Sequence, residues 1–353
     1  MKNPAIDFRS DNSGRASTEM IDALQAANTG TALGYGGDAL TAALQVRMEQ
    51  VFEAPVRVFP VPTGTAANAV ALAACCSPFG AVYCSPLAHI NTSECNATSF
   101  FGGGTKLVGI DGPHGKVDAA ALQAAIDTAG AGLAHKSQPA AVNLVQATDL
   151  GAVYEPAEVS AISRVAHARG LTVHMDGARF ANALVTLGCT PAEASWRAGV
   201  DVLSLGVTKN GGLLTDAIVV FAPHTASTIG FHLRRAGLVW SKMRFASAQV
   251  LAYVENDLWL RLARQANAAA SGIAARIAPL AGVTLIAPVQ ANELFVELAS
   301  AAALDGLEHD GLLFQRRGPR LARFICRWDT TEAECAALVA AIVRQSAGAP
   351  AAR

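Results

Sequence analysis

Short apolar runs that alternate with helical stretches are the feature that most constrains the fold of this chain. Between residues 55 and 222, strand-like runs recur and are separated by amphipathic or alanine-rich segments. Repeated β-α-β order with nearly continuous apolar strands predicts a mostly parallel sheet with helices on both faces. We therefore expect an α/β protein. The strand candidates are 57–61, 81–84, 140–145, 171–175, 200–207 and 216–221.

The pattern changes after residue 245 and predicts a second, smaller unit. Long helices are expected over 249–277, followed by shorter strand candidates and a last helix from residue 331. This order is typical of a small α+β domain. We expect residues 1–248 to form an N-terminal arm and a large domain, and 249–353 a small C-terminal domain. The last residues, 347–353, are expected to form a frayed end.

Two charged residues follow neighbouring strand candidates. Asp176 directly follows the run 171–175, and Lys209 follows the run 200–207. An acid and then a lysine in this order are typical of enzymes that hold pyridoxal phosphate (PLP) through a lysine. There the lysine forms a Schiff base with the cofactor aldehyde and the acid pairs with the pyridine nitrogen, keeping it protonated. Taken singly, Asp176 could end an ordinary turn and Lys209 could be a solvated loop lysine.

Two further groups strengthen this interpretation. Gly64 and Thr65 stand at a strand-to-helix junction, where free N–H groups and the helix dipole favour a phosphate; the simpler alternative is a helix cap. His89 follows another strand candidate and could stack on a ring, although a loop histidine is often only structural. Because all four groups follow apolar runs in the order of a PLP site, chance is the weaker explanation.

Composition excludes several classes of protein. The chain has 353 residues, of which 52% are hydrophobic and 16% charged, so a large core or subunit interface is expected. The net charge of -1 gives no reason to expect nucleic acid or a membrane surface as partner. No signal-peptide pattern opens the chain, and no apolar stretch is long enough to span a bilayer. Seven cysteines without metal-ligand spacing predict reduced thiols in a cytoplasm and no metal site.

Five motifs together resemble the low-specificity L-threonine aldolases. These are PLP enzymes of the aspartate aminotransferase fold, the type I PLP-dependent transferase fold, so the resemblance implies that fold and PLP as cofactor. It extends over about residues 6–342 and is closest to a bacterial branch typified by pseudomonads. The motifs are FRSDN (8–12), YGGD (35–38), TGTAAN (63–68), HMDGAR (174–179) and TKN (208–210).

The resemblance implies a role for each matching residue in cofactor binding. Lys209 would carry PLP, Asp176 would pair with the ring nitrogen, and His89 would stack on the ring. The phosphate would lie on Gly64 and Thr65. Arg179 would lie beside the phenolic oxygen of the ring and the substrate.

Other matching residues are implied to bind substrate or to lie at a subunit interface. Ser10 and Arg323 would hold the substrate carboxylate, a task that suits a guanidinium fork. Tyr35 and Arg244 match positions that reach the site of a neighbouring subunit, so a homotetramer built from dimers with shared sites is expected. For Arg244, an exposed interface arginine is as good an explanation as a phosphate contact.

The implied reaction is the reversible cleavage of a β-hydroxy-α-amino acid to glycine and an aldehyde by a carbon–carbon lyase. L-Threonine and L-allo-threonine are the expected substrates, with a preference for L-phenylserine as the alternative. Where many relatives have a histidine, this chain has Asp149. Either Asp149 or His89 could take the β-hydroxyl proton; alternatively, Asp149 only caps a turn. Loose selectivity at the β-carbon is therefore expected.

Rival functions remain to be tested. A β-eliminating lyase or an aminotransferase of the same fold would keep Asp176 and Lys209. A nucleotide-binding oxidoreductase is disfavoured because no GxGxxG follows the first strand and FGGGTK (101–106) lacks the spacing of a P-loop. A non-catalytic scaffold is disfavoured because the whole set of cofactor residues is present.

Overall fold

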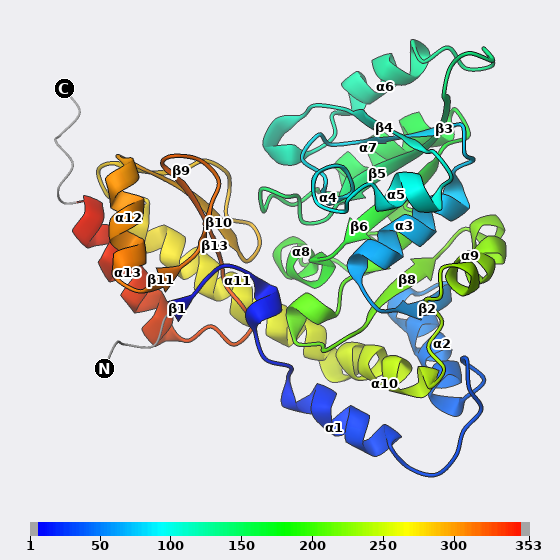
Figure 1. Ribbon diagram of the computed structural model, residues 1–353, viewed down its shortest axis with the longest axis horizontal. Helices are drawn as coiled ribbons and strands as arrows, with labels where there is room; N and C mark the ends of the chain where they lie inside the picture. The colour runs from blue at the N-terminus through cyan, green and yellow to red at the C-terminus, as the bar shows by residue number, and fades with distance from the viewer. Residues whose placement is uncertain (1–5, 347–353) are drawn as a thin grey trace.

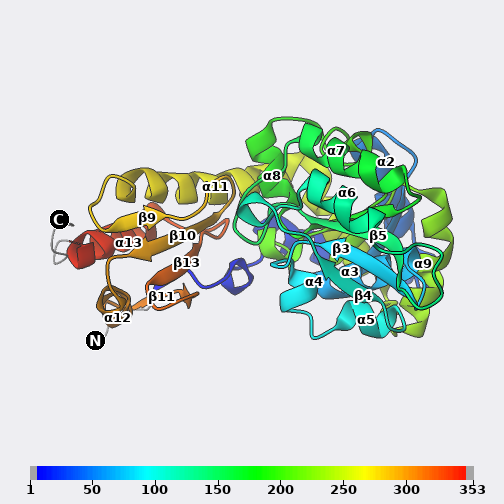
Figure 2. The same ribbon diagram turned by 90° about the horizontal axis from the view of Figure 1, so that it is seen from above.

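A computed structural model describes residues 6–346 of the chain, so the expectation for residues 347–353 lies outside the described part. The described chain forms a large unit around a seven-stranded sheet and a smaller unit around a four-stranded sheet (Figure 1). Helix α11 (Leu258–Ile277) runs from the large unit into the smaller one, as the view from above shows (Figure 2).

The large sheet is mostly parallel, as predicted. Only β8 runs antiparallel to its two neighbours, β2 and β7, and the other neighbouring pairs are parallel. The carboxyl ends of the central strands therefore meet at one edge. In sheet order the strands are β2 (Arg57–Val61), β8 (Asp216–Val220), β7 (Val202–Leu205), β6 (Thr172–Gly177), β5 (Gln138–Val145), β3 (Gly80–Cys84) and β4 (Lys106–Gly109).

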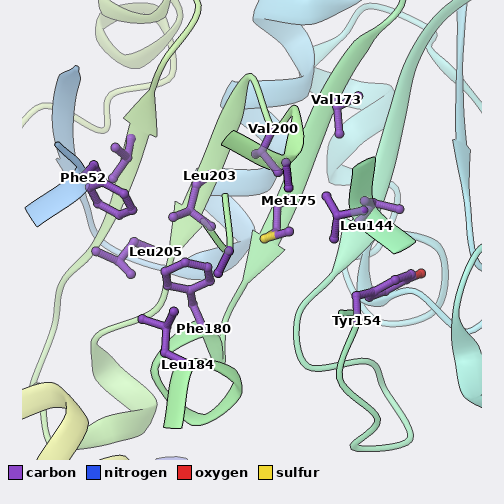
Figure 3. Packing of buried hydrophobic residues seen from close by; sticks show 14 of the residues in the cluster. Phe52, Leu144, Tyr154, Val173, Met175, Phe180, Leu184, Val200, Leu203 and Leu205 are labelled. Atoms are coloured by element: carbon purple, nitrogen blue, oxygen red, sulfur yellow. The ribbon is translucent and has the colours of Figure 1, made fainter. Parts of the chain in front are cut away.

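The central strands are held by an apolar core on the faces of the sheet. Met175 and Leu203 come from adjacent strands and are fully buried with Phe52 and Phe180, whose ring centroids lie 6.3 Å apart (Figure 3). Burying a side chain of this size stabilises the fold by about 1.5–3 kcal/mol. This packing fixes the strand ends that carry polar residues.

Helices cover both faces of this sheet. Several begin where a polar side chain satisfies a free N–H group; for example, the Thr63 hydroxyl accepts from the N–H of Ala66 at the start of α3. The helices of the large unit are α1 (Thr18–Ala27), α2 (Ala39–Phe52), α3 (Gly64–Cys75), α4 (His89–Thr92), α5 (Ala97–Phe101), α6 (Ala119–Asp127), α7 (Pro156–His167), α8 (Phe180–Leu187), α9 (Pro223–Arg235) and α10 (Met243–Val254).

The smaller unit is an antiparallel sheet covered by helices, as the α+β prediction requires. Its strand order is β12-β13-β10-β9, with bounds Gln315–Arg316, Leu321–Ile325, Glu293–Leu298 and Val283–Leu285. Helices α12 (Ala301–His309) and α13 (Glu332–Ser346) pack with α11 around a second apolar cluster. The predicted helical stretch over 249–277 is two helices, because Asn256 and Asp257 adopt positive φ between α10 and α11.

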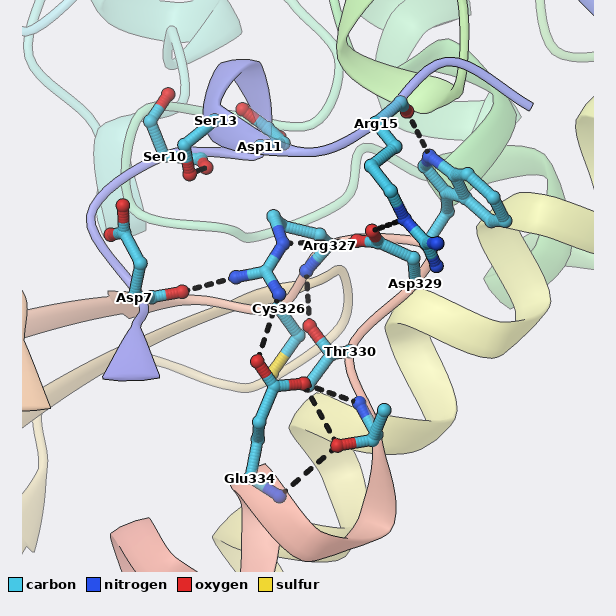
Figure 4. Close-up of polar contacts among 12 residues, drawn as sticks. Asp7, Ser10, Asp11, Ser13, Arg15, Cys326, Arg327, Asp329, Thr330 and Glu334 are labelled. Atoms are coloured by element: carbon cyan, nitrogen blue, oxygen red, sulfur yellow. Dashed lines mark hydrogen bonds and ion pairs between the residues drawn. The ribbon is translucent and has the colours of Figure 1, made fainter. Parts of the chain in front are cut away.

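The N-terminal segment belongs structurally to both units. Strand β1 (Ile6–Asp7) pairs with β11 (Leu312–Leu313), and Phe8 packs in the second apolar cluster. The guanidinium of Arg327 contacts the carbonyl of Asp7 and pairs with Asp329 at 2.9 Å (Figure 4). The segment that follows β1 carries Ser10 toward the large unit. The domain boundary after residue 248 remains a prediction. The change from the apolar core of the large unit to the apolar cluster of the smaller unit falls within α11.

Three further features of the described residues concern membrane spans, metal ligands and cysteines. Over residues 6–346, no helix has the length and apolar character needed to cross a membrane. Within the same residues, no group of three or more histidine, cysteine, aspartate or glutamate side chains is arranged to hold a metal ion. All seven cysteines are free thiols.

Candidate active site

A cavity of about 900 Å³ lies at the carboxyl ends of β5, β6 and β7. The start of α3 forms one side of the cavity, and the N-terminal segment and the β12–β13 hairpin form the other. Open α/β sheets bind ligands at this edge. The structure brings nine of the eleven predicted site residues to the cavity: Ser10, Gly64, Thr65, His89, Asp149, Asp176, Arg179, Lys209 and Arg323.

Lys209 lies in a short 3-10 turn that is anchored on both sides. One carboxylate oxygen of Asp216 accepts from the N–H groups of Val207 (2.8 Å) and Thr208 (3.0 Å), and the amide of Asn210 donates to the hydroxyl of Tyr253 at 2.9 Å. The turn ends at Gly211 with φ of 91°, where a Cβ atom would lie 2.7 Å from a methyl group of Leu262. The backbone at Lys209 is therefore fixed while its amine has no bonded partner within residues 6–346.

Asp176 is buried at the end of β6 and is oriented through both carboxylate oxygens. Oδ1 accepts from the N–H of Ala178 at 3.0 Å, and Oδ2 accepts from the amide of Asn68 at 2.8 Å. His174, two residues earlier, is buried too, and burial lowers its pKa to about 4. His174 is therefore neutral at pH 7.

His89 is held by a buried carboxylate. Nδ1 lies 2.7 Å from Oε1 of Glu94, whose side chain is completely buried, and the amide of Asn68 donates to the same oxygen at 2.9 Å. The hydrogen bond to Glu94 is the main reason why the pKa of His89 is raised. A chain of hydrogen bonds thus connects His89 through Glu94 and Asn68 to Asp176. We call His89, Asp176 and Lys209 the floor of the site.

The start of α3 provides an anion-binding position beside this floor. The N–H groups of Gly64 and Thr65 stand in the first turn, where a helix has no internal acceptors, whereas the Thr63 hydroxyl accepts from Ala66. A Cβ atom built on Gly64 would meet nothing closer than an Asp216 oxygen at 3.9 Å. A ligand can therefore approach this backbone closely.

These groups fit PLP. The cavity presents an amine that has no partner among the described residues, a buried and oriented carboxylate, an imidazole and a free helix N-terminus. These groups match the aldehyde, ring nitrogen, ring face and phosphate of the cofactor. The structure also explains why the four groups converge, because each follows a strand that ends at the same edge of the sheet.

A second group is joined by ion pairs at the cavity, and we call it the wall: Asp11, Arg179, Glu293 and Arg323. Arg179 is paired with Asp11 (2.8 Å) and with Glu293 (2.5 Å), and Arg323 is paired with Glu293 (2.8 Å). The carboxylate of Glu293 is completely buried and connects arginines from the two units. Arg323 also donates to Gln315 at 3.1 Å. The guanidinium groups of Arg179 and Arg323 are therefore already neutralised by acids of the same chain.

Asp149 lies between the floor and the wall and is largely buried. Burial is the main cause that raises its pKa to about 7, and the nearby carboxylates of Asp176 and Glu293 add to the effect. Its Oδ2 is buried without a hydrogen-bond donor within the described chain. Asp149 is therefore poised to exchange a proton near neutral pH.

Tyr35 and Arg244 are not among the residues that line the cavity of their own chain. The side chain of Tyr35 is 57% exposed, and the guanidinium of Arg234 stacks 4.6 Å from the centre of its ring. Arg244 donates to the carbonyl oxygen of Thr29 at 3.1 Å. Within one chain, neither residue contacts the floor or the wall, so the predicted contacts of both depend on a neighbouring subunit.

Several polar residues of the site were missed in the sequence. Asp11 and Asn68 lie inside recognised motifs, and Glu94 follows His89 by five residues. Each could therefore have been found from its closeness in sequence to a predicted site residue. Glu293 is an acid at the start of an apolar strand run, which is a signal of a buried ion pair. Asp216 gives the same signal at the start of β8.

Comparison with known proteins identifies the family of the chain. The model of the "Beta-eliminating lyase" family matches residues 7–301. A low specificity L-threonine aldolase from Pseudomonas aeruginosa is 42% identical over 92% of this chain and 93% of its own length. One from another Pseudomonas species is 40% identical over 97% of this chain and 98% of its own. Both relatives confirm the predicted likeness to a pseudomonad branch.

A solved structure extends the comparison to the fold. A threonine aldolase from Leishmania major superimposes with a TM-score of 0.88 and 25% sequence identity, covering 96% of this chain and 98% of that one. This likeness confirms the predicted PLP-dependent transferase fold of type I, with a large mixed sheet and a small C-terminal unit.

Proposed function

The chain belongs to the β-eliminating lyase family and, within it, to the low-specificity L-threonine aldolases, and from this premise we propose how its residues carry out the reaction. It is a PLP-dependent carbon–carbon lyase that cleaves β-hydroxy-α-amino acids to glycine and an aldehyde. The convergence of nine predicted site residues on one cavity is the observation that supports the roles proposed below.

In our proposal the floor holds the cofactor. Lys209 would bind it covalently, Asp176 would face the ring nitrogen, His89 would lie against the ring, and the first turn of α3 at Gly64 and Thr65 would bind the phosphate. When bound, PLP accepts the electron pair that is left when the Cα–Cβ bond breaks. The two hydrogen bonds to Asp176 support this role, because an oriented, buried carboxylate stabilises a proton on the ring nitrogen.

The substrate carboxylate would bind between Ser10 and the wall. Arg323 presents its fork toward the cavity from β13, and the segment with Ser10 is fastened to the smaller unit by Arg327 (Figure 4). Arg179 would lie between cofactor and substrate. Fixing the carboxylate on these groups orients the bond to be cleaved and lowers the entropic cost of reaction.

The β-hydroxyl proton has two candidate acceptors. Nδ1 of His89 is engaged by Glu94, which leaves Nε2 available toward the cavity, directly or through a water molecule. Asp149, with a pKa of about 7, is the other acceptor. Replacing Asp149 by histidine tests the second assignment: a changed threo/erythro ratio of cleavage supports it, and an unchanged ratio removes Asp149 from the β-carbon chemistry.

The preferred β-substituent is tested by comparing substrates. We expect the purified protein to show a visible PLP band and to release acetaldehyde from L-threonine and L-allo-threonine. Faster release of benzaldehyde from L-phenylserine would identify the phenylserine-preferring alternative. A PLP band without aldehyde release would contradict the aldolase assignment and favour an eliminase or aminotransferase, which ammonia release or transfer to a keto acid would then distinguish.

Tyr35 and Arg244 support a proposal about assembly. Both are placed outside their own cavity, so in a homotetramer of dimers they would contribute to the site of a neighbour. Mixing Lys209→Ala subunits with Arg244→Ala subunits tests this: partial recovery of activity after subunit exchange is expected, because hybrid dimers would contain one intact site. No recovery from two inactive variants would contradict shared sites.

We also propose a cytoplasmic location. Seven free thiols support it, since unpaired cysteines are typical of a reducing compartment. Fractionation of the source cells with an activity assay tests this proposal.

A further inference from the structure

Arg317 lines the same cavity and has no role in the site described so far. It directly follows β12 in the β12–β13 hairpin, where Gln315 is paired with Arg323 and Arg316 with Ala322. The backbone N–H of Arg317 donates to the carbonyl of Leu321 at 2.8 Å, which continues this register. Because side chains alternate along a strand, Arg317 shares the face of Gln315, whereas Arg316 points to the other face.

The two neighbouring arginines differ in their partners. Arg316 is paired with Asp305 at 2.5 Å and with Glu308 at 2.9 Å on the outer face. Arg317 has no such partner: within residues 6–346, no carboxylate lies within ion-pair distance of its guanidinium, and Asp149 and Glu293 act on it only from farther away. A guanidinium that faces a substrate cavity without an acid is free to bind an anion.

The charge balance of the wall strengthens this point. Arg179 and Arg323 are opposed by the two buried carboxylates of Asp11 and Glu293, which lie at 2.5–2.8 Å from them. Two cations and two anions leave no net charge for an incoming carboxylate. Among the three arginines that line the cavity, Arg317 is the one without an acid at ion-pair distance within residues 6–346. Partial burial and the nearby guanidinium of Arg323 lower the pKa of Arg317, and the negative charge of a bound anion would oppose both effects.

We propose that Arg317 binds a carboxylate of the amino-acid substrate, a role that rests on the proposed aldolase function. The α-carboxylate is the first source, because every β-hydroxy-α-amino acid carries it. The second source is a carboxylate on the β-carbon, as in 3-hydroxyaspartate, which the same cleavage would convert to glycine and glyoxylate. Both sources present the planar, bidentate acceptor that suits an arginine fork.

The test compares Arg317→Gln with Arg316→Gln in the holoenzyme. Both changes remove one positive charge from adjacent positions of the same hairpin, but only the first removes it from the cavity. We expect Arg317→Gln to lower kcat/KM for L-threonine about tenfold, mainly through KM, as the loss of one charge-assisted hydrogen bond implies. Arg316→Gln should stay within about twofold of the unmodified protein, because its charge is screened by solvent and paired outside the cavity.

A second substrate separates the two sources. Equal losses with L-threonine and L-3-hydroxyaspartate assign the α-carboxylate to Arg317. A loss confined to L-3-hydroxyaspartate assigns the carboxylate on the β-carbon. Losses no larger than those of Arg316→Gln with both substrates overturn the proposal.

Binding of glycine separates this inference from the proposed function. The dissociation constant of glycine, measured by calorimetry, requires no turnover. If the unmodified protein releases no aldehyde, the aldolase function fails; a glycine affinity that still falls in Arg317→Gln and not in Arg316→Gln would sustain the carboxylate site. Unchanged glycine affinity together with unchanged kcat/KM for both substrates would exclude it.

Discussion

The floor and the wall of the cavity are built by different physical means. Each floor residue stands at or just after the end of a strand, and the parallel sheet brings these ends together. The wall is instead joined by ion pairs between segments that are distant in the chain; Asp11 and Arg179 are 168 positions apart. Within the described chain the amine of Lys209 has no partner, whereas the arginines of the wall are neutralised by buried acids. The comparison teaches that the floor is prepared for covalent chemistry and the wall for holding and orienting charge.

The largest expected effect comes from removing the lysine of the floor. Lys209→Ala should reduce aldehyde release to the detection limit, because no other amine lines the cavity in the described residues. Lys136→Ala, on an exposed loop, is the matched control and should retain full activity. Aldehyde release and the visible absorption of both variants are the measurements. Turnover like that of the unmodified protein in Lys209→Ala, with PLP present, would show that the floor is not the reactive centre.

A change in the wall should act first on stability. Glu293→Gln leaves the charges of Arg179 and Arg323 partly uncompensated in a buried place, so the free energy of unfolding should fall by about 3 kcal/mol. Glu332→Gln breaks an exposed pair with Arg276 and should cost less than about 1 kcal/mol. Urea denaturation at pH 7 measures both. Equal, small losses would mean that the wall is not held together by its buried carboxylate.

The hydrogen bond between His89 and Glu94 should affect the pH dependence of catalysis. Glu94 raises the pKa of His89, so Glu94→Gln should lower that pKa and move the acidic limb of the kcat/KM profile to lower pH. The same bond stabilises the folded state at pH values below the pKa of an unfolded histidine, and this contribution is lost as pH rises through the raised pKa. Glu94→Gln should therefore lose more stability in acid than in alkali.

These two pH dependences can be checked together. The control is Glu332→Gln, in which neither the profile nor the pH dependence of stability should move. An acidic limb that stays in place in Glu94→Gln would assign that limb to a group other than His89.

The smallest effect concerns Asp149, between the two regions. Its pKa is raised to about 7, so the folded state favours the protonated carboxyl. The stability that this preference adds is fully present below the pKa of an unfolded aspartate, and it is lost as pH rises through about 7. Asp149→Asn should remove part of the fall in melting temperature between pH 5.5 and pH 8. The same fall in the variant and in the unmodified protein would show that Asp149 does not titrate in this range.

The contrast between floor and wall also explains which site residues could be predicted. Asp176 and Lys209 were found because an apolar run followed by a charged residue marks a strand end in a parallel sheet. Glu94 and Asn68 lie close in sequence to recognised residues, but only the structure shows that their side chains meet at 2.9 Å. Arg317 was missed because one of two adjacent arginines cannot be chosen before the register of the hairpin is known.

The fold, too, could be predicted from the sequence only in part. The positions of the central strands and the change of pattern after residue 245 followed from periodicity, which depends on local backbone geometry. The break between α10 and α11 did not, because Asn256 and Asp257 carry only a weak turn signal within a helical pattern.

The sequence by itself determined the fold class, the order of the cofactor residues and the family, because each depends on patterns within a few neighbouring residues. Only the tertiary structure decided which acid neutralises which arginine, which imidazole nitrogen is engaged, and which guanidinium remains free. The physical reason is that ion pairs and hydrogen bonds act over a few ångströms between segments whose separation in sequence carries no information about their distance in space.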